Sequence, residues 1–276
     1  MAKVPDYDSA LIKKKSNVSS LAGSMFARLK SPKRHDSLSS LQRAINTSAD
    51  FLFDKQKDDG HWRFDLEADV TIPSEYIFLQ RFLGKSNRGR DLGMCKYLLS
   101  RQNDNGSWPL YHGGPGNISA TVKAYFALKL VGYSANEEFM RKAKNWVHEN
   151  GGAETVNVFT RITLAMFGQL NWKTVPAMPV EIMFLPNWWF FNLNRVSYWS
   201  RCVIVPLLII FAKKPVVLVD EKQHITELFK RHPLKLKKLD FFKPRHPLKN
   251  GFILLDRILK ILEPFIPNVL RNQAMN

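Results

Sequence analysis

A pattern of leucine, glutamine, glycine and tryptophan that occurs twice limits the possible folds of this chain more than any other feature. Leu52, Gln56, Gly60 and Trp62 recur 46 residues later as Leu98, Gln102, Gly106 and Trp108. We expect each set to end a helix and reverse the chain, because glycine supplies the backbone freedom of the turn and tryptophan covers it. Helical hairpins repeated at this period bury their faces against neighbours, in a solenoid or a closed double ring.

Apolar residues elsewhere recur at helical spacing, and the two-residue alternation typical of strands is absent. The first predicted helix follows an N-cap at Asp36 or Ser37, and its apolar stripe is Leu38, Leu41, Ile45, Ala49 and Leu52. Further helices are predicted over residues 76–83, 92–99, 118–130, 139–147 and 159–166. A third, degraded copy of the repeat ends at Asn150 without a final tryptophan. The sequence therefore predicts an all-α protein.

Basic residues are concentrated at the two ends of the chain. The formal net charge is +17, and Lys and Arg are enriched in residues 1–40 and 213–276. A polyanion or an anionic membrane surface is the natural partner of such segments. The lysines are interspersed with leucine, phenylalanine and proline, which suits a lipid interface better than nucleic acid. We expect an anionic membrane surface, and no nucleic acid, as a partner.

Four regions are predicted along the chain: a flexible basic arm, a helical repeat region, a basic proline-containing linker and an amphipathic helix, over residues 1–36, 37–212, 213–250 and 251–276. We expect no signal peptide, because lysines interrupt the first apolar stretch. The longest apolar run, Val203–Ala212, has about ten residues, whereas spanning a bilayer takes about twenty. We therefore expect no transmembrane span. Cys95 and Cys202 are isolated, so neither a disulfide framework nor a zinc site is predicted.

The last region contains an amphipathic helix with a wide apolar surface. One stripe is Phe252, Leu255, Leu259 and Leu262, and an adjacent one is Leu254, Ile258 and Ile261. The narrow polar face consists of Asp256, Lys260 and Glu263. Such a helix favours the interface of an anionic membrane, although a buried packing helix has the same pattern.

The segments Gln56–Trp62 and Gln102–Trp108 resemble the Gln-Trp repeats of the terpene cyclase and oxidosqualene cyclase superfamily. Further segments resemble the N-terminal part of squalene-hopene cyclases in order and spacing, namely 66–72, 74–76, 108–115, 158–161 and 179–185. The resemblance covers residues 37–276. It implies helical hairpins forming part of an α/α double barrel, or toroid, in a two-barrel protein whose second barrel is inserted in the chain of the first. It also implies an apolar cavity between the barrels, where squalene is cyclised to hopanoids by an isomerase that uses no cofactor or metal.

The proton donor of that family is the middle Asp of an Asp-x-Asp-Asp motif, which does not occur in this sequence; residues 58–59 and 65–69 do not match it. We therefore expect these residues to be inactive alone. The resemblance implies squalene or a similar polyprenyl lipid as substrate, and a C-terminal cyclase half or a second copy as partner. It also implies a monotopic protein on the cytoplasmic side of the membrane, with the last helix leading toward the other barrel.

The resemblance also suggests three residues that line the substrate pocket. Trp199 aligns with a cation-stabilising tryptophan, Phe159 lies in a matching segment, and Glu75 aligns with a carboxylate at one end of the cavity. The alternatives are a core or interface aromatic for Trp199 and a helix carboxylate paired with a base for Glu75. Lys123 and Asn157 depart from the charges that some members have near that carboxylate. Glu67 and Asp69 are expected to cap or pair, and the Gln-Trp residues to be structural.

Two other functions fit parts of the sequence. A non-catalytic remnant would bind a membrane or a partner chain through its uncovered barrel surface. A prenyltransferase subunit also has a double ring of helices, but it would need a zinc set of Asp, Cys and His, and the two isolated cysteines argue against it.

Overall fold

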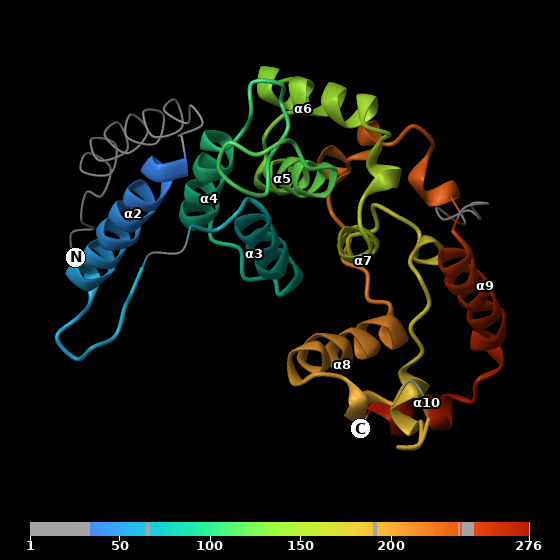
Figure 1. The fold of residues 1–276 in the computed structure, drawn as a ribbon. Helices are drawn as coiled ribbons and strands as arrows, with labels where there is room; N and C mark the ends of the chain where they lie inside the picture. The colour runs from blue at the N-terminus through green and yellow to red at the C-terminus, as the bar shows by residue number, and fades with distance from the viewer. Residues whose placement is uncertain (1–33, 65–66, 190–191, 237, 239–245, 276) are drawn as a thin grey trace, which may run out of the picture. The chain divides into compact units, whose positions relative to one another are not determined.

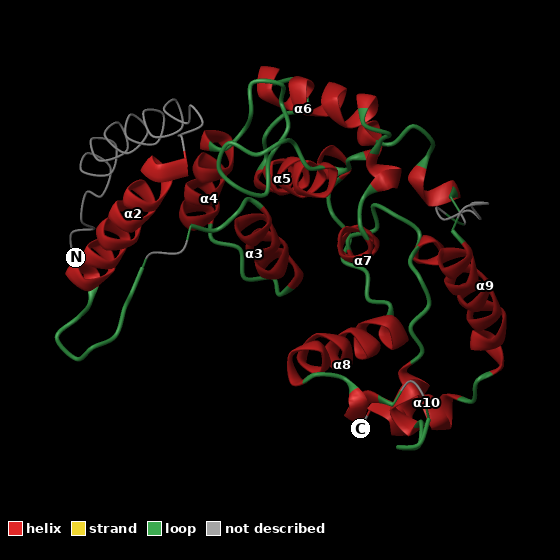
Figure 2. Cartoon of the chain, in the orientation of Figure 1, coloured by secondary structure: helices red, strands yellow, loops and turns green. Residues whose placement is uncertain are grey.

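The computed structural model describes residues 34–64, 67–189, 192–236, 238 and 246–275, with side chains from residue 39 onward. Helices and loops make up the described residues, and two isolated bridges are their only β-type pairings (Figure 2). The long helices are α2 (Arg34–Lys55), α3 (Thr71–Phe82), α4 (Arg88–Ser100), α5 (Ile118–Val131), α6 (Glu138–Glu149), α7 (Val158–Met166), α8 (Tyr198–Lys213), α9 (Pro247–Leu262) and α10 (Asn268–Met275). The prediction of an all-α fold is confirmed.

The chain divides into two compact units, Met1–Leu66 and Glu67–Asn276. The first unit contains α2 and the first Gln-Trp turn. Its helix begins at Arg34, ahead of the N-cap predicted at Asp36 or Ser37, while the rest of the predicted basic arm, residues 1–33, lies outside the described residues.

Helix α5 forms the centre of the second unit, with α3, α4 and α6 packed around it (Figure 1). Its side chains are buried from Ser119 through Leu130, which explains why this helix is apolar on most of its faces. Asn117 caps its start by accepting from two backbone N–H groups, and Gly132, at φ 112°, ends it. The rings of Phe78, Phe126 and Phe167 meet at centroid distances of 5.2 to 5.8 Å, which joins α3, α5 and the end of α7 in one core.

The predicted linker over residues 213–250 contains a segment that returns to this core. Ile225, Leu228 and Phe229 are buried in the core that contains α5. They lie in and directly beside the short 3₁₀ turn η6 (Thr226–Leu228), which stands between the turns η5 (Glu221–Gln223) and η7 (Pro233–Lys235). Three-residue turns have no amphipathic period, so the apolar pattern of the sequence does not distinguish them from a linker.

The region predicted as one amphipathic helix over residues 251–276 contains two helices. Helix α9 begins at Pro247, where proline is favoured because its missing N–H would be unpaired anyway. It ends at Leu262, and after the 3₁₀ turn η8 (Glu263–Phe265) the chain continues as α10. Pro264 cannot extend α9, which accounts for the break.

The polar face of α9 is turned toward the protein, and its apolar stripes are turned outward. Asp256 Oδ1 accepts from Ala177 N at 2.6 Å, and Lys260 Nζ donates to Lys173 O at 3.0 Å. Ile253 is the buried residue of α9, whereas most of the predicted stripe residues are exposed, including Phe252, Leu254, Leu255, Ile258, Ile261 and Leu262. Within the described residues, the polar face of α9 therefore contacts the protein and the apolar stripes are exposed.

Among the described residues, no helix is both long and apolar enough to cross a bilayer.

Candidate functional site

The two Gln-Trp turns have the same internal geometry. The indole N–H of Trp62 donates to Leu52 O at 2.6 Å, and that of Trp108 donates to Leu98 O at 2.7 Å. The Nε2 atoms of Gln56 and Gln102 donate to Gly60 O and Gly106 O at 2.7 and 2.8 Å. Both glycines have positive φ, 88° and 87°, a region that favours glycine. Each turn is thus closed by its own tryptophan and glutamine.

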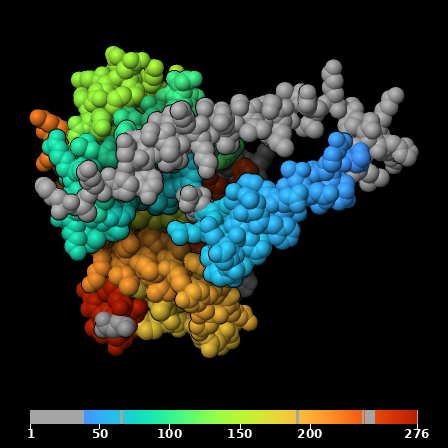
Figure 3. Space-filling model, turned by 90° about the vertical axis from the view of Figure 1, so that its left-hand side faces the viewer, coloured from blue at the N-terminus to red at the C-terminus, as the bar shows by residue number. Residues whose placement is uncertain are grey.

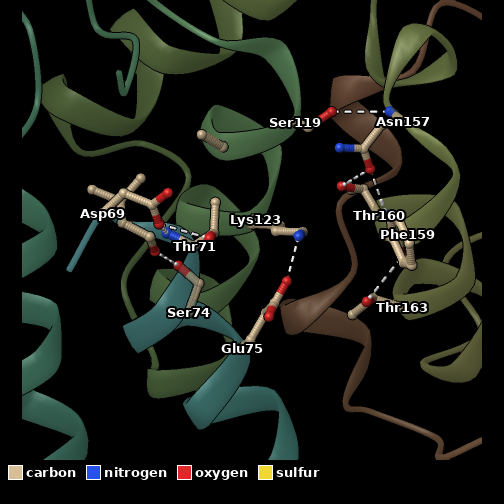
Figure 4. Close-up of polar contacts among 12 residues, drawn as sticks. Asp69, Thr71, Ser74, Glu75, Ser119, Lys123, Asn157, Phe159, Thr160 and Thr163 are labelled. Atoms are coloured by element: carbon tan, nitrogen blue, oxygen red, sulfur yellow. Dashed lines mark hydrogen bonds and ion pairs between the residues drawn. The ribbon is translucent and has the colours of Figure 1, made fainter. Parts of the chain in front are cut away.

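Glu75 on α3 is paired with Lys123 on the central helix α5. Figure 4 shows the Lys123 ammonium directed at the Glu75 carboxylate, and Nζ donates to Oε1. The Lys123 side chain is 7% exposed and the Glu75 side chain 47% exposed, so the carboxylate lies where a buried cation meets open space. Lys123, one of the two residues that depart from the family pattern, is therefore the base that pairs with Glu75.

Removal of one partner from this pair should cost more stability than removal of both. Glu75→Gln leaves the Lys123 ammonium buried without its counter-charge, and we expect the free energy of unfolding to fall by about 1–3 kcal/mol. Adding Lys123→Met removes the stranded charge and should restore part of the loss. Urea unfolding of both single variants and the double variant measures this coupling, and strictly additive losses would contradict it.

Asn157 contributes to helix packing and lies outside this ion pair. Its side chain accepts from Thr160 N at 2.9 Å and so caps α7, while its own N–H donates to Ser119 Oγ on α5 at 2.9 Å. Phe159, two residues after Asn157 and labelled beside it in Figure 4, is 53% exposed. The cap fixes the start of α7 against α5, and with it the position of the Phe159 ring.

Trp199 is the second residue of α8 and is 81% exposed. Helix α8 packs against α7 through Ile162, Ala165 and Phe211, and atoms of the α8 region are visible in orange in Figure 3. Trp199 is therefore outside the core of the described residues, and its exposure fits both a pocket residue and an interface aromatic. Further exposed aromatic residues lie near it in sequence, namely Trp188, Trp189 and Tyr198. The adjacent pair Trp188 and Trp189 could have indicated an exposed aromatic surface from the sequence, but the sequence analysis did not include it.

The comparisons with known proteins identify the family. The model of the squalene-hopene cyclase N-terminal domain matches residues 45–276. The squalene-hopene cyclase of Schizosaccharomyces japonicus is 40% identical over 239 residues, covering 86% of this chain and 36% of that protein. That of Zymomonas mobilis is 43% identical over 227 residues, covering 82% and 34%. This chain belongs to the squalene-hopene cyclase family. It spans about a third of the length of these relatives.

The polar residues that flank the first turn of this cyclase-family chain are engaged in local structure. Glu67 is ion-paired with Arg101. Asp69 Oδ1 accepts from Thr71 N at 2.8 Å and from Thr71 Oγ1 at 2.6 Å, next to the start of α3. Glu67 is paired, as its position in the sequence suggested, whereas Asp69 bonds Thr71 across Val70, the N-cap residue of α3.

The strongly perturbed groups of this family member lie in its core. Burial raises the pKa of the Cys95 thiol to about 12, with a smaller contribution from the nearby Asp91 charge. Burial also raises the pKa of Tyr125, and the Glu227 carboxylate, which accepts from its hydroxyl at 2.9 Å, adds to the shift. Both groups remain protonated near neutral pH. Glu227 also forms an ion pair with Lys129 at 2.9 Å and so joins the returning segment to α5. The sequence analysis did not identify this contact.

Within the described residues, no group of three or more His, Cys, Asp or Glu side chains is placed to hold a metal ion.

Proposed function

We propose that this chain forms one wall of the cyclisation cavity of a squalene-hopene-type cyclase, and that the catalytic acid comes from a part of the enzyme outside these 276 residues. The observation on which this rests is the set of exposed aromatic rings on ordered helices in a member of this family. Their faces are apolar and electron-rich, which is what a folded polyene and its carbocations require. The substrate class is squalene or a similar polyprenyl lipid.

Phe159 and Trp199 are the proposed wall residues. Each ring lies near the start of its helix. Asn157 caps α7 and Ser197 caps α8, so both helix starts are fixed. Packing between the two helices positions both rings on one substructure. A ring held this way stabilises a cation without having to reorganise during the reaction.

Glu75 is proposed to bind water, or to accept the final proton, at the polar end of the cavity. Its exposed side gives access to a reacting group, while Lys123 holds the carboxylate from behind. A fixed carboxylate close to a cation that forms late in the reaction would stabilise that cation electrostatically and accept its proton.

The membrane is the proposed location of this activity, through the outward apolar face of α9. The substrate of such an enzyme dissolves in the bilayer, and an apolar helix face with basic surroundings suits an anionic interface. We place the chain on the cytoplasmic side as a peripheral, monotopic protein.

Squalene turnover tests the proposed function. This chain and the part of the Zymomonas mobilis relative that follows the matched segment, which we expect to contain the Asp-x-Asp-Asp acid, are purified separately and incubated with squalene, alone and together. Hopene in the mixture and in neither chain alone is the expected result, because neither chain has both the wall and the acid. Circular dichroism shows that both chains are folded. Absence of product from the mixture of folded chains would favour the alternative of a non-catalytic remnant, and product from this chain alone would overturn the assignment of the acid.

A further inference from the structure

Helix α8 contains a proline in its interior. Pro206 lies in the middle of the helix, which runs from Tyr198 to Lys213 without a break. A proline has no N–H, so it cannot donate the helical hydrogen bond to the carbonyl four residues earlier, and its ring crowds that carbonyl. The main-chain carbonyl of Cys202 therefore has no helical donor.

The Cys202 carbonyl lies on the same face of α8 as the proposed wall residue Trp199. Residues three or four positions apart share a helix face, which groups Trp199, Cys202 and Pro206. All three are exposed, Trp199 to 81%. Leu208 and Phe211, the buried residues of α8, lie on the other side of the helix. The proline thus acts on the face that the proposed function assigns to the cavity.

A carbonyl without a helical donor adds a partial negative charge to this face. Helical carbonyls point along the axis toward the C-terminal end, so the Cys202 oxygen lies beside Pro206, about one turn beyond Trp199. This oxygen is the negative end of the peptide dipole. An electron-rich ring and a partial negative charge are therefore neighbours on one helix face.

Core packing does not account for the proline. Pro206 is exposed, so its ring fills no part of the core that α8 forms with α7. Alanine at this position would keep the helical hydrogen bond, and it is the best helix former. A residue that weakens its own helix without a gain in packing is typical of functional or strained sites.

We propose that Pro206 is a positioning residue for the cyclisation. Because it supplies no N–H, the Cys202 carbonyl is free to stabilise, together with the Trp199 ring, a carbocation that forms against this part of the cavity wall. Squalene is an uncharged hydrocarbon, so the carbonyl gains little from the bound substrate and interacts strongly only with the positive charge as it develops. Such a group raises kcat without tightening substrate binding. This inference rests on the proposed function, since the carbonyl acts on a cation only if this face lines the cavity.

The variant Pro206→Ala tests the role of the missing N–H. It returns a donor to the Cys202 carbonyl, and we expect kcat of the two-part mixture to fall by about 10-fold with KM unchanged. The melting temperature of the chain should rise or stay the same, because alanine favours the helix. A loss of rate without a loss of stability separates this effect from damage to the fold. Ile209→Ala, on the same exposed face, leaves the main chain as it is and should change kcat by less than about 2-fold.

A second variant separates the missing N–H from the proline ring. Lactic acid, introduced at position 206 by nonsense suppression, has neither the ring nor an N–H, so the Cys202 carbonyl stays without a donor. We expect its kcat to lie close to that of the unaltered chain. An equal fall for Pro206→Ala and for the lactic acid variant would attribute the effect to the ring or to the bend of α8, and would overturn the proposal.

The state of the carbonyl can be measured in the chain alone. Cys95 and Cys202 are the two cysteines of the sequence, so cysteine labelled with ¹³C at its carbonyl marks two peptide groups. Hydrogen bonding lowers the infrared frequency of a carbonyl, and one of the two bands should move down in Pro206→Ala and stay in place in the lactic acid variant. Unmoved bands in Pro206→Ala would show that the carbonyl is not free, which contradicts the proposal.

The outcomes distinguish this inference from the proposed function. Hopene formed at equal kcat by the unaltered chain and by Pro206→Ala, with the infrared shift present, would overturn the role of Pro206 and leave the proposed function intact. Absence of hopene from the unaltered mixture of folded chains would count against the proposed function, and against this inference with it.

Discussion

Replacing Leu254 and Ile261 of α9 with aspartate is expected to release the chain from anionic vesicles. Both side chains are exposed on the outward face, while Asp256 and Lys260 hold the helix from the other side. Burial of each apolar side chain in the bilayer interface is worth about 1.5–3 kcal/mol, so the double change should weaken vesicle binding by about 100-fold or more. Flotation with vesicles rich in phosphatidylglycerol measures the bound fraction.

The control for this prediction is the same chemical change on another exposed stripe. Leu41→Asp with Ile45→Asp on α2 adds the same charge, and it should leave vesicle binding nearly unchanged. Neither pair should alter stability by more than about 0.5 kcal/mol, because all four residues are exposed. Undiminished flotation of the α9 variant would rule out this helix as the membrane contact.

Replacing Trp199 with alanine is expected to slow hopene formation in the two-part mixture by about 30-fold. A cation-π contact in a desolvated site contributes about 2 kcal/mol, and its loss raises the barrier by that amount. Trp199→Phe retains an aromatic face and should lose much less. Gas chromatography of extracted lipids under initial-rate conditions measures both variants.

Because Trp199 is exposed, its replacement should change the rate of hopene formation without changing the stability of the chain. Its side chain has few contacts to lose within this chain, so alanine should leave folding intact. Equal rates for Trp199→Ala and the unaltered chain, at equal affinity for the catalytic part, would show that this ring does not line the cavity.

Local structure could be predicted from the sequence to a large extent. The predicted helices over 118–130 and 139–147 correspond to α5 (Ile118–Val131) and α6 (Glu138–Glu149), and both Gln-Trp turns lie where the repeat places them. These features depend on contacts within about ten residues, such as the bond from Trp108 to Leu98. Periodicity and a few special residues are sufficient to specify such contacts.

Three features of this protein were decided only by the tertiary structure. Glu75 meets Lys123 across 48 residues, Glu227 meets Tyr125 across 102, and Asp256 meets Ala177 across 79. The last of these turns the polar face of α9 toward the rest of the described residues, an orientation that the sequence alone does not specify. The sequence by itself determined the helices, the repeat and the family, because helix formation and turn chemistry are local. Which charges pair and which apolar face stays open depends on how distant segments pack, and no pattern in neighbouring residues encodes that.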